Sequence, residues 1–166
     1  MTSAILNSYY GWYDIIDPAG FATETPPAEG TIPPRVGGAN GLVGMTQPWR
    51  AMVATGTRWG PVQVTTEVLT EQPHDPAAEY EEVVEVDFTV LSDRLTIVDW
   101  DGQLVQEFSA SPGSWRLRAH ARGRQEGAAQ EWDIFDPDDP DTEFVEEHLL
   151  QFFPGPELGE VVIRHR

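Results

Sequence analysis

The sequence predicts an all-β protein, an antiparallel β-sandwich of about eight or nine strands with a long Pro/Gly-rich loop after the first strand. Three observations support this fold class. Segments that alternate between apolar and polar residues recur along the chain, turn signals separate them roughly every 8–12 residues, and few segments show helical periodicity. No internal repeat and no linker divides the chain, so we expect residues 1–166 to form a single domain.

The first predicted strand covers residues 4–17, which are rich in aromatic and β-branched residues. Residues 18–40 follow, with five prolines and four glycines. Proline has no backbone N–H to donate within a sheet, so this segment is predicted to be an irregular surface loop. A loop of this length is usually functional or mobile.

The later strands follow from alternation and from turn residues. Residues 79–91 alternate most clearly, with one apolar face and one face that is largely charged. The Asp101–Gly102 dipeptide predicts a tight hairpin turn. We predict further strands at residues 61–70, 94–100, 103–109, 114–122, 142–153 and 160–166, and one or two strands around Pro48 within residues 41–57.

A helix stays open as an alternative in two places. Residues 127–132 have no strand pattern, and residues 144–153 carry apolar side chains at a spacing that also fits a period of 3.6. For the second segment we favour a strand.

The chain is strongly acidic, with 28 acidic residues, 10 basic residues that are all arginine, and a formal net charge of −18. Such a charge repels nucleic acid, and the apolar runs are too short to span a membrane. The N-terminus has neither the basic nor the apolar region of a signal peptide, so we expect a cytoplasmic protein. Cysteine is absent, which excludes disulfides, thiolate metal sites and cysteine nucleophiles.

Catalytic motifs are missing from the sequence. It has no G-x-S-x-G turn, no phosphate-binding glycine loop and no H-E-x-x-H pair. The four histidines, at positions 74, 120, 148 and 165, are scattered, and no two have ligand spacing. We therefore expect a protein with no catalytic residues, no metal site and no cofactor.

Residues 131–147, with the sequence EWDIFDPDDPDTEFVEE, hold nine acidic residues. They are interpreted as a solvated acidic loop, which we place at 125–142, or as a surface that binds a basic partner. A calcium loop is a weaker alternative, because Pro137 and Pro140 interrupt the run and it lacks the required glycine. Carboxylates on a proline-stiffened loop can imitate phosphates, and interleaved aromatic residues can anchor an interface. The candidate partner-binding residues are Trp132, Asp133, Phe135, Asp136, Asp138, Asp139, Asp141 and Glu143.

Residues 115–124, WRLRAHARGR, are the one basic concentration in the sequence. In a strand, Arg116, Arg118, His120 and Arg122 would lie on one face. Cross-strand pairing with Glu81, Glu85 and Asp87 is favoured over a nucleic-acid stripe, and the lone His120 is interpreted as structural. Most of the six tryptophans are expected in the core, although exposed ones would suit a carbohydrate-binding sandwich.

Much of the chain resembles the competence protein J family, small acidic inhibitors of a nuclease of DNA uptake. The resemblance lies in SYYGWYDIID, GLVG, GPVQVTTEVLT, YEEVVEVDFTVLSDRLTI and QEFSASPGSWRLRAHARG, which together span roughly residues 8–124. Residues 125–166 depart from the family pattern, and the 18–40 loop is longer. The resemblance implies a β-sandwich without catalysis and a partner that is a nuclease or another toxin.

The first hypothesis is therefore a non-enzymatic acidic protein-binding module, an inhibitor or immunity-type partner of a basic protein such as a nuclease. The second is a structural subunit of a larger particle that self-associates through its sheet edges. The third is a β-sandwich that binds calcium or carbohydrate. The sequence does not indicate an oligomeric state.

Overall fold

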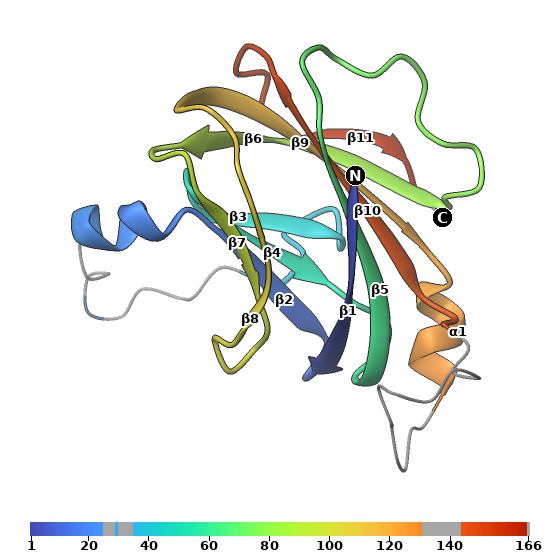
Figure 1. Cartoon of the computed structure of the whole chain (residues 1–166). Coiled ribbons are helices and arrows are strands. Elements are labelled where there is room, and N and C mark those ends of the chain that lie inside the picture. Colours follow the sequence, from blue (N-terminus) through green and yellow to red (C-terminus); the bar gives the residue numbers. More distant parts are fainter. Residues whose placement is uncertain (25–28, 30–34, 131–143, 166) are drawn as a thin grey trace.

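The computed structural model describes residues 1–24, 29, 35–130 and 144–165, and within them eleven strands form one curled, mixed sheet (Figure 1). The strands are β1 (Thr2–Tyr9), β2 (Trp12–Ile16), β3 (Val43–Gln47), β4 (Arg50–Ala54), β5 (Trp59–Val68), β6 (Glu82–Val90), β7 (Leu95–Val98), β8 (Leu104–Phe108), β9 (Gly113–Arg122), β10 (Glu147–Pro154) and β11 (Val161–Arg164). A 3-10 helix, η1 (Pro18–Thr23), and a short α-helix, α1 (Arg124–Ala129), complete the described elements.

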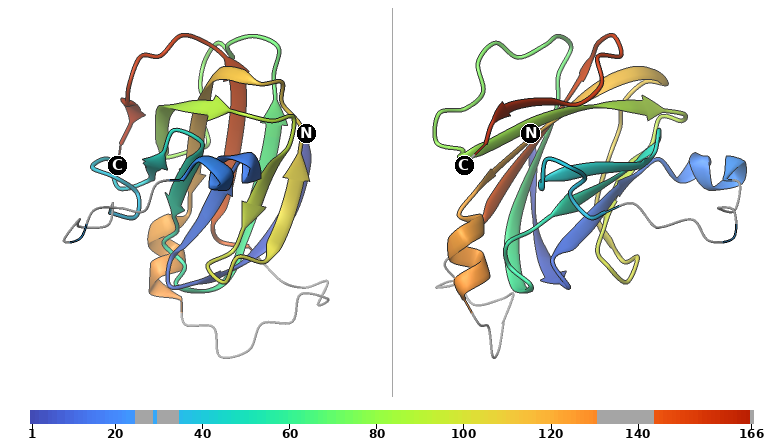
Figure 2. Two further views of the ribbon diagram at one scale, coloured as in Figure 1. Left: turned by 90° about the vertical axis from the view of Figure 1, so that its left-hand side faces the viewer. Right: turned by 180° about the vertical axis from the view of Figure 1, so that it is seen from behind.

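The strand order is β11-β6-β9-β10-β5-β1-β2-β4-β3, and a β7–β8 pair adds to β2. β1 joins β2 only near their turn, through Tyr9 and Trp12, so the sheet bends sharply there. The bend brings β3 close to β6, and the N–H of Thr89 donates to the carbonyl of Pro48 (2.7 Å). The sheet therefore curls around its own inner face, as both views of Figure 2 show.

The hydrophobic core fills the inside of this curl. Alternation places every second side chain of a strand on the inner face. β9 contributes Trp115, Leu117, Ala119 and Ala121, and its neighbour β6 contributes Val84, Val86, Phe88 and Val90. The faces expected for these two strands are therefore confirmed.

The all-β class is confirmed. The sandwich of two sheets is not confirmed, because the described strands form one continuous mixed sheet. The purely antiparallel arrangement is wrong, because β10 runs parallel to β5 between β5 and β9. Parallel neighbours need a long connection, and here about 80 residues separate the two strands. No local turn signal in the sequence could therefore predict that they pair.

The described strands number eleven rather than eight or nine, chiefly because the first predicted strand, 4–17, is two strands. Tyr10 (φ 63°) and Gly11 (φ 87°) form a two-residue turn in which both residues have positive φ, as in a type I′ turn. Tyrosine is an unusual residue for the first of these positions, so the sequence pattern indicated one continuous strand instead of two.

Other boundaries also differ from expectation. The 41–57 segment does hold two strands, and the 142–153 segment is a strand that begins at Glu147 rather than a helix. The 18–40 loop begins with η1, and the 125–142 acidic loop begins with most of α1. Among the described residues, no helix is both long enough and apolar enough to cross a bilayer.

Candidate functional site

The predicted partner-binding residues lie outside the described part of the chain. They are Trp132, Asp133, Phe135, Asp136, Asp138, Asp139, Asp141 and Glu143. From here on, the acidic run means residues 131–143; the structure describes α1 before it and Glu146 after it. These two flanks show where the acidic run is attached to the fold.

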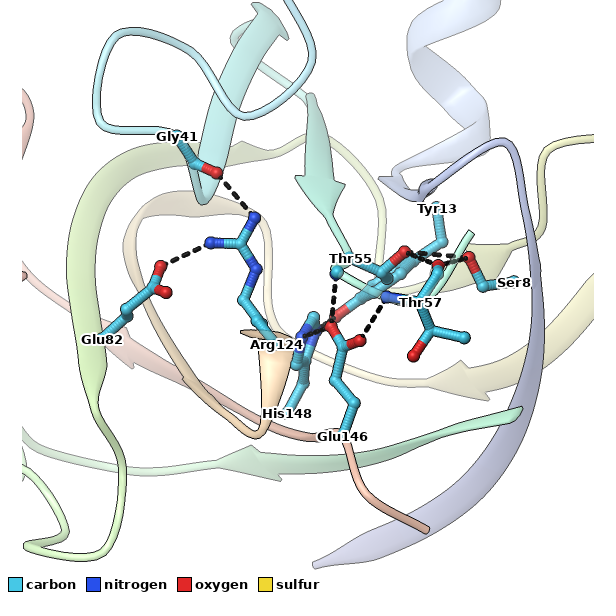
Figure 3. Close-up of polar contacts among 10 residues, drawn as sticks. Ser8, Tyr13, Gly41, Thr55, Thr57, Glu82, Arg124, Glu146 and His148 are labelled. Carbon is cyan, nitrogen blue, oxygen red and sulfur yellow. Dashed lines mark hydrogen bonds and ion pairs between the residues drawn. The ribbon is translucent and has the colours of Figure 1, made fainter. Parts of the chain in front are cut away.

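Glu146 is a buried carboxylate that fastens the run's C-terminal flank to the loop between β4 and β5 (Figure 3). Its Oε1 accepts from the N–H of Gly56 (2.9 Å), and its Oε2 accepts from the N–H of Thr57 (2.7 Å). Oε1 also lies 2.9 Å from Nε2 of His148, whose Nδ1 lies 2.9 Å from the hydroxyl of Tyr13. Glu146, His148 and Tyr13 are all fully or almost fully buried.

The charges of this buried chain follow from its contacts. Burial raises the pKa of Glu146, but hydrogen bonds from His148 and Thr57 outweigh it and hold the pKa below its usual value. Burial, reinforced by the charge of Glu146, raises the pKa of Tyr13 well above its usual value. An ionised Glu146 can only accept, so the Nε2–H of His148 donates to it. The three side chains form a continuous hydrogen-bonded chain, which acts as an internal clamp.

α1 fastens the other flank of the acidic run to the same loop. A Cβ on Gly56 would lie 1.8 Å from the carbonyl oxygen of Arg124, and a Cβ on Gly127 would lie 2.3 Å from Oγ1 of Thr57. Only glycine allows such close approach. Arg124 also donates to Glu82 (2.5 Å) and to the carbonyl of Gly41 (3.0 Å). Both flanks of the acidic run therefore contact the β4–β5 loop.

The basic stretch is used inside the protein, as the pairing interpretation predicted. Nε of Arg118 donates to Glu85 (2.6 Å), and Arg116 pairs with both Glu85 (3.3 Å) and Asp87. In the β6–β9 register, Glu85 lies opposite Arg118 and Asp87 lies opposite Arg116. The two arginines and Glu85 are almost completely buried.

This ion-pair network also holds the loops that cover the outer face of β6 and β9. Asp87 accepts from the N–H groups of Leu158 (3.0 Å) and Gly159 (2.8 Å). Arg118 donates to the carbonyl of Pro73 (3.2 Å). Partial burial raises the pKa of Asp87. The hydrogen bonds from Leu158, Gly159 and Arg116 outweigh this effect, so the pKa lies below its usual value.

His120 is a buried histidine that makes the stability of the fold depend on pH. Its Nδ1 lies 3.1 Å from the carbonyl of Leu149, and its Nε2 has no partner among the described residues. Burial, which penalises the charged form, lowers its pKa from 6.5 to about 4. The folded state therefore resists protonation that the unfolded state accepts.

We expect the stability to fall by roughly 2–4 kcal/mol through His120 as the pH drops from about 6.5 to about 4. The sign follows because a depressed folded-state pKa contributes stability that is complete above the unfolded-state pKa and is lost on acidification. Urea unfolding at several pH values measures it. A His120→Asn variant, whose amide can still donate to Leu149, should show a flatter profile in this window. The exposed control His74→Asn should keep the wild-type slope, and an equal slope in all three proteins would refute the assignment.

Most arginines of the described residues form ion pairs. Within this part of the chain, six arginines pair with six carboxylates. The pairs cancel in charge, so the whole surplus of −18 lies on side chains outside them. What the protein presents to a partner is therefore strongly acidic.

The structure also reveals a feature that sequence reasoning missed, a group of aromatic residues in mutual contact at one end of the sheet. We call it the aromatic surface; its members are Tyr9, Tyr10, Trp12, Trp59 and Trp100. Tyr10, Trp59 and Trp100 are 54%, 48% and 40% exposed. Of the five tryptophans that the structure describes, only Trp49 and Trp115 are buried, so the expectation that most tryptophans lie in the core is wrong. No local signal separates these residues from core tryptophans, because the buried Trp115 also lies within two residues of a glycine, Gly113.

No three His, Cys, Asp or Glu side chains within the described ranges are placed to hold a metal ion together. Two open hollows, of about 350 and 410 Å³, share Met45 and Asp87 in their linings.

Comparison with known proteins places the fold. No protein-family model and no curated protein matches the chain. Among solved structures, ComJ from Bacillus subtilis, an inhibitor of the DNA-degrading activity of NucA, superposes with a TM-score of 0.60 over 92% of this chain and 95% of its own. The fold is ComJ-like. The crocagin biosynthetic gene J product shares it, with a TM-score of 0.58 over 93% of this chain and 98% of its own.

The sequence identities are 11% with ComJ and 15% with the crocagin protein. The likeness therefore shows the fold alone, and it extends over nearly the whole chain. The resemblance seen in residues 8–124 is confirmed at the level of fold. The structural likeness covers 92% of the chain and so extends beyond those residues.

Proposed function

We propose that this protein is a non-enzymatic inhibitor or immunity-type partner of a basic protein such as a nuclease, acting in the cytoplasm. The ComJ-like fold is the observation that carries the proposal, since ComJ itself inhibits a nuclease. The net charge of −18 supports it independently, because nucleases present cationic grooves to phosphates.

The electrostatics of the described residues suit this role. Among the described residues, six arginines pair with carboxylates, and the acidic surplus lies on side chains outside those pairs. Such a surplus attracts a cationic partner over a distance and speeds its association. A rigid acidic protein in a nuclease groove would neutralise the groove and exclude DNA.

In this proposal the acidic run carries the main contact. Asp138, Asp139 and Asp141 would replace phosphates in the partner's groove, with Trp132 and Phe135 as apolar anchors. The clamp at Glu146 and the packing of α1 support the proposal, because they attach both flanks of the run to the β4–β5 loop.

We expect reversal of Asp138, Asp139 and Asp141 to arginine to weaken binding to the partner nuclease by about tenfold or more at low salt, chiefly through slower association. The nuclease is first captured on the immobilised protein at low salt and eluted at high salt, and association is then followed by surface plasmon resonance. Reversal of the exposed Glu71, Asp75 and Glu79 changes the net charge equally and serves as the control. An unchanged affinity after the first triple reversal would show that the run is not the contact.

A further inference from the structure

We propose that the aromatic surface is a docking site for arginine side chains of a basic partner protein. The inference rests on the proposed function and assigns a contact surface to it. This surface consists entirely of described residues and is distinct from the acidic run.

Three separate turns build the aromatic surface, at the end of the sheet where β1 and β7 finish and β5 begins (Figure 1). Tyr10 from the β1–β2 turn lies with its ring centroid 5.1 Å from that of Trp59 and 4.9 Å from that of Trp100. Tyr9 contacts the same two tryptophans at 5.4 and 6.1 Å. The rings hold one another in place, and Tyr10, Trp59 and Trp100 still expose about half of their area, which makes a preformed apolar platform.

The backbone at Tyr10 indicates that this platform is not there for stability. Its φ of 63° lies in the left-handed region, which bulky residues rarely adopt. In a type I′ turn the first central position is normally asparagine, aspartate or glycine. A strained residue that persists at an exposed turn is a reason to expect a function there, and what tyrosine adds is a ring against Trp12, Trp59 and Trp100.

The charge of the protein selects the occupant. The faces of aromatic rings are electronegative and attract cations, and arginine stacks on them better than lysine does. Asp101 is exposed next to Trp100, and the protein as a whole is strongly acidic. A second copy of this chain would bring another −18 charge and is disfavoured by repulsion. Arg58 is also exposed at this end, and its positive charge offsets that of Asp101. The proposed attraction therefore rests on the ring faces rather than on local carboxylates.

The experiment compares two peptides of equal charge, octa-arginine and octa-lysine, by isothermal titration calorimetry at physiological salt. General electrostatic attraction acts on both peptides, so the ratio of their affinities isolates the stacking contribution. We expect the wild type to prefer octa-arginine, and the Trp59→Ser/Trp100→Ser double variant to lose about fivefold of that ratio. Phe21→Ser removes an exposed aromatic ring elsewhere and should keep the wild-type ratio.

A second variant separates binding from folding. Tyr10→Asn places the favoured residue in the turn, so its melting temperature should equal or exceed that of the wild type while the arginine preference falls. A ratio unchanged in both variants would overturn the proposal, since forked contacts with carboxylates would then explain the preference. Stronger binding of the neutral sugar maltohexaose than of octa-arginine at the aromatic surface would also overturn it, in favour of a carbohydrate site.

These outcomes are independent of the nuclease experiment. Loss of nuclease binding after reversal in the acidic run, together with an unchanged peptide ratio in the aromatic variants, would refute this inference alone. A fall in the ratio without any basic protein partner would refute the proposed function and keep the arginine-binding surface.

Discussion

Replacing Glu85 with alanine is expected to lower the free energy of unfolding by about 3–5 kcal/mol, or to prevent folding. Glu85 accepts from both Arg116 and Arg118, and all three side chains are almost completely buried. Without the carboxylate, two buried guanidinium groups lose a counter-charge that water cannot replace. Urea denaturation followed by tryptophan fluorescence measures the loss.

The matched control is Glu107→Ala. Glu107 also pairs with an arginine, Arg94, at 2.6 Å, but both side chains are about half exposed. We expect this substitution to cost less than about 1 kcal/mol. Equal costs for the two glutamates would show that the Glu85 network contributes no more than a surface ion pair.

The second large effect is expected for Glu146→Ala, at about 2–4 kcal/mol of unfolding free energy. The substitution leaves the N–H groups of Gly56 and Thr57 and Nε2 of His148 without their acceptor in a buried place. The control is its neighbour Glu147, whose pair with Arg122 is partly exposed, and Glu147→Ala should cost less than about 1 kcal/mol.

The pH dependence gives this prediction a second readout. The pKa of Glu146 is lowered in the folded state, so its contribution is complete above the unfolded-state pKa of about 4.5 and is lost as the pH falls through the folded-state pKa. We expect the wild type to lose part of its stability in that acidic window and Glu146→Ala to lose less. If the variant were as stable as the wild type at neutral pH, Glu146 would not be a clamp.

The local sequence pattern could predict those parts of the fold in which two neighbouring strands pair in a regular register. Alternation in 79–91 and 114–122 identified the inner faces of β6 and β9 and the pairing of Glu85 and Asp87 with arginines. Burial of one face forces that register, since a shift by one residue would move every charge into the core.

The parts that could not be predicted depend on contacts between distant segments. His148 and Tyr13 are 135 residues apart, and β10 joins β5 in parallel, so neither contact has a local signal. The turn at Tyr10 was not predicted, because tyrosine rarely adopts the positive φ that this turn requires. The aromatic surface was missed for a related reason, since three turns bring its members together only in the folded chain.

The central claim, that an acidic ComJ-like protein inhibits a basic nuclease without doing chemistry, is tested most directly by DNA degradation. Supercoiled DNA and a basic nuclease encoded in the same genome are incubated with increasing amounts of the protein, at low and at high sodium chloride. The account predicts complete protection of the DNA by an equimolar amount at low salt and weaker protection as salt rises. Undiminished DNA degradation at low salt with excess protein would contradict it.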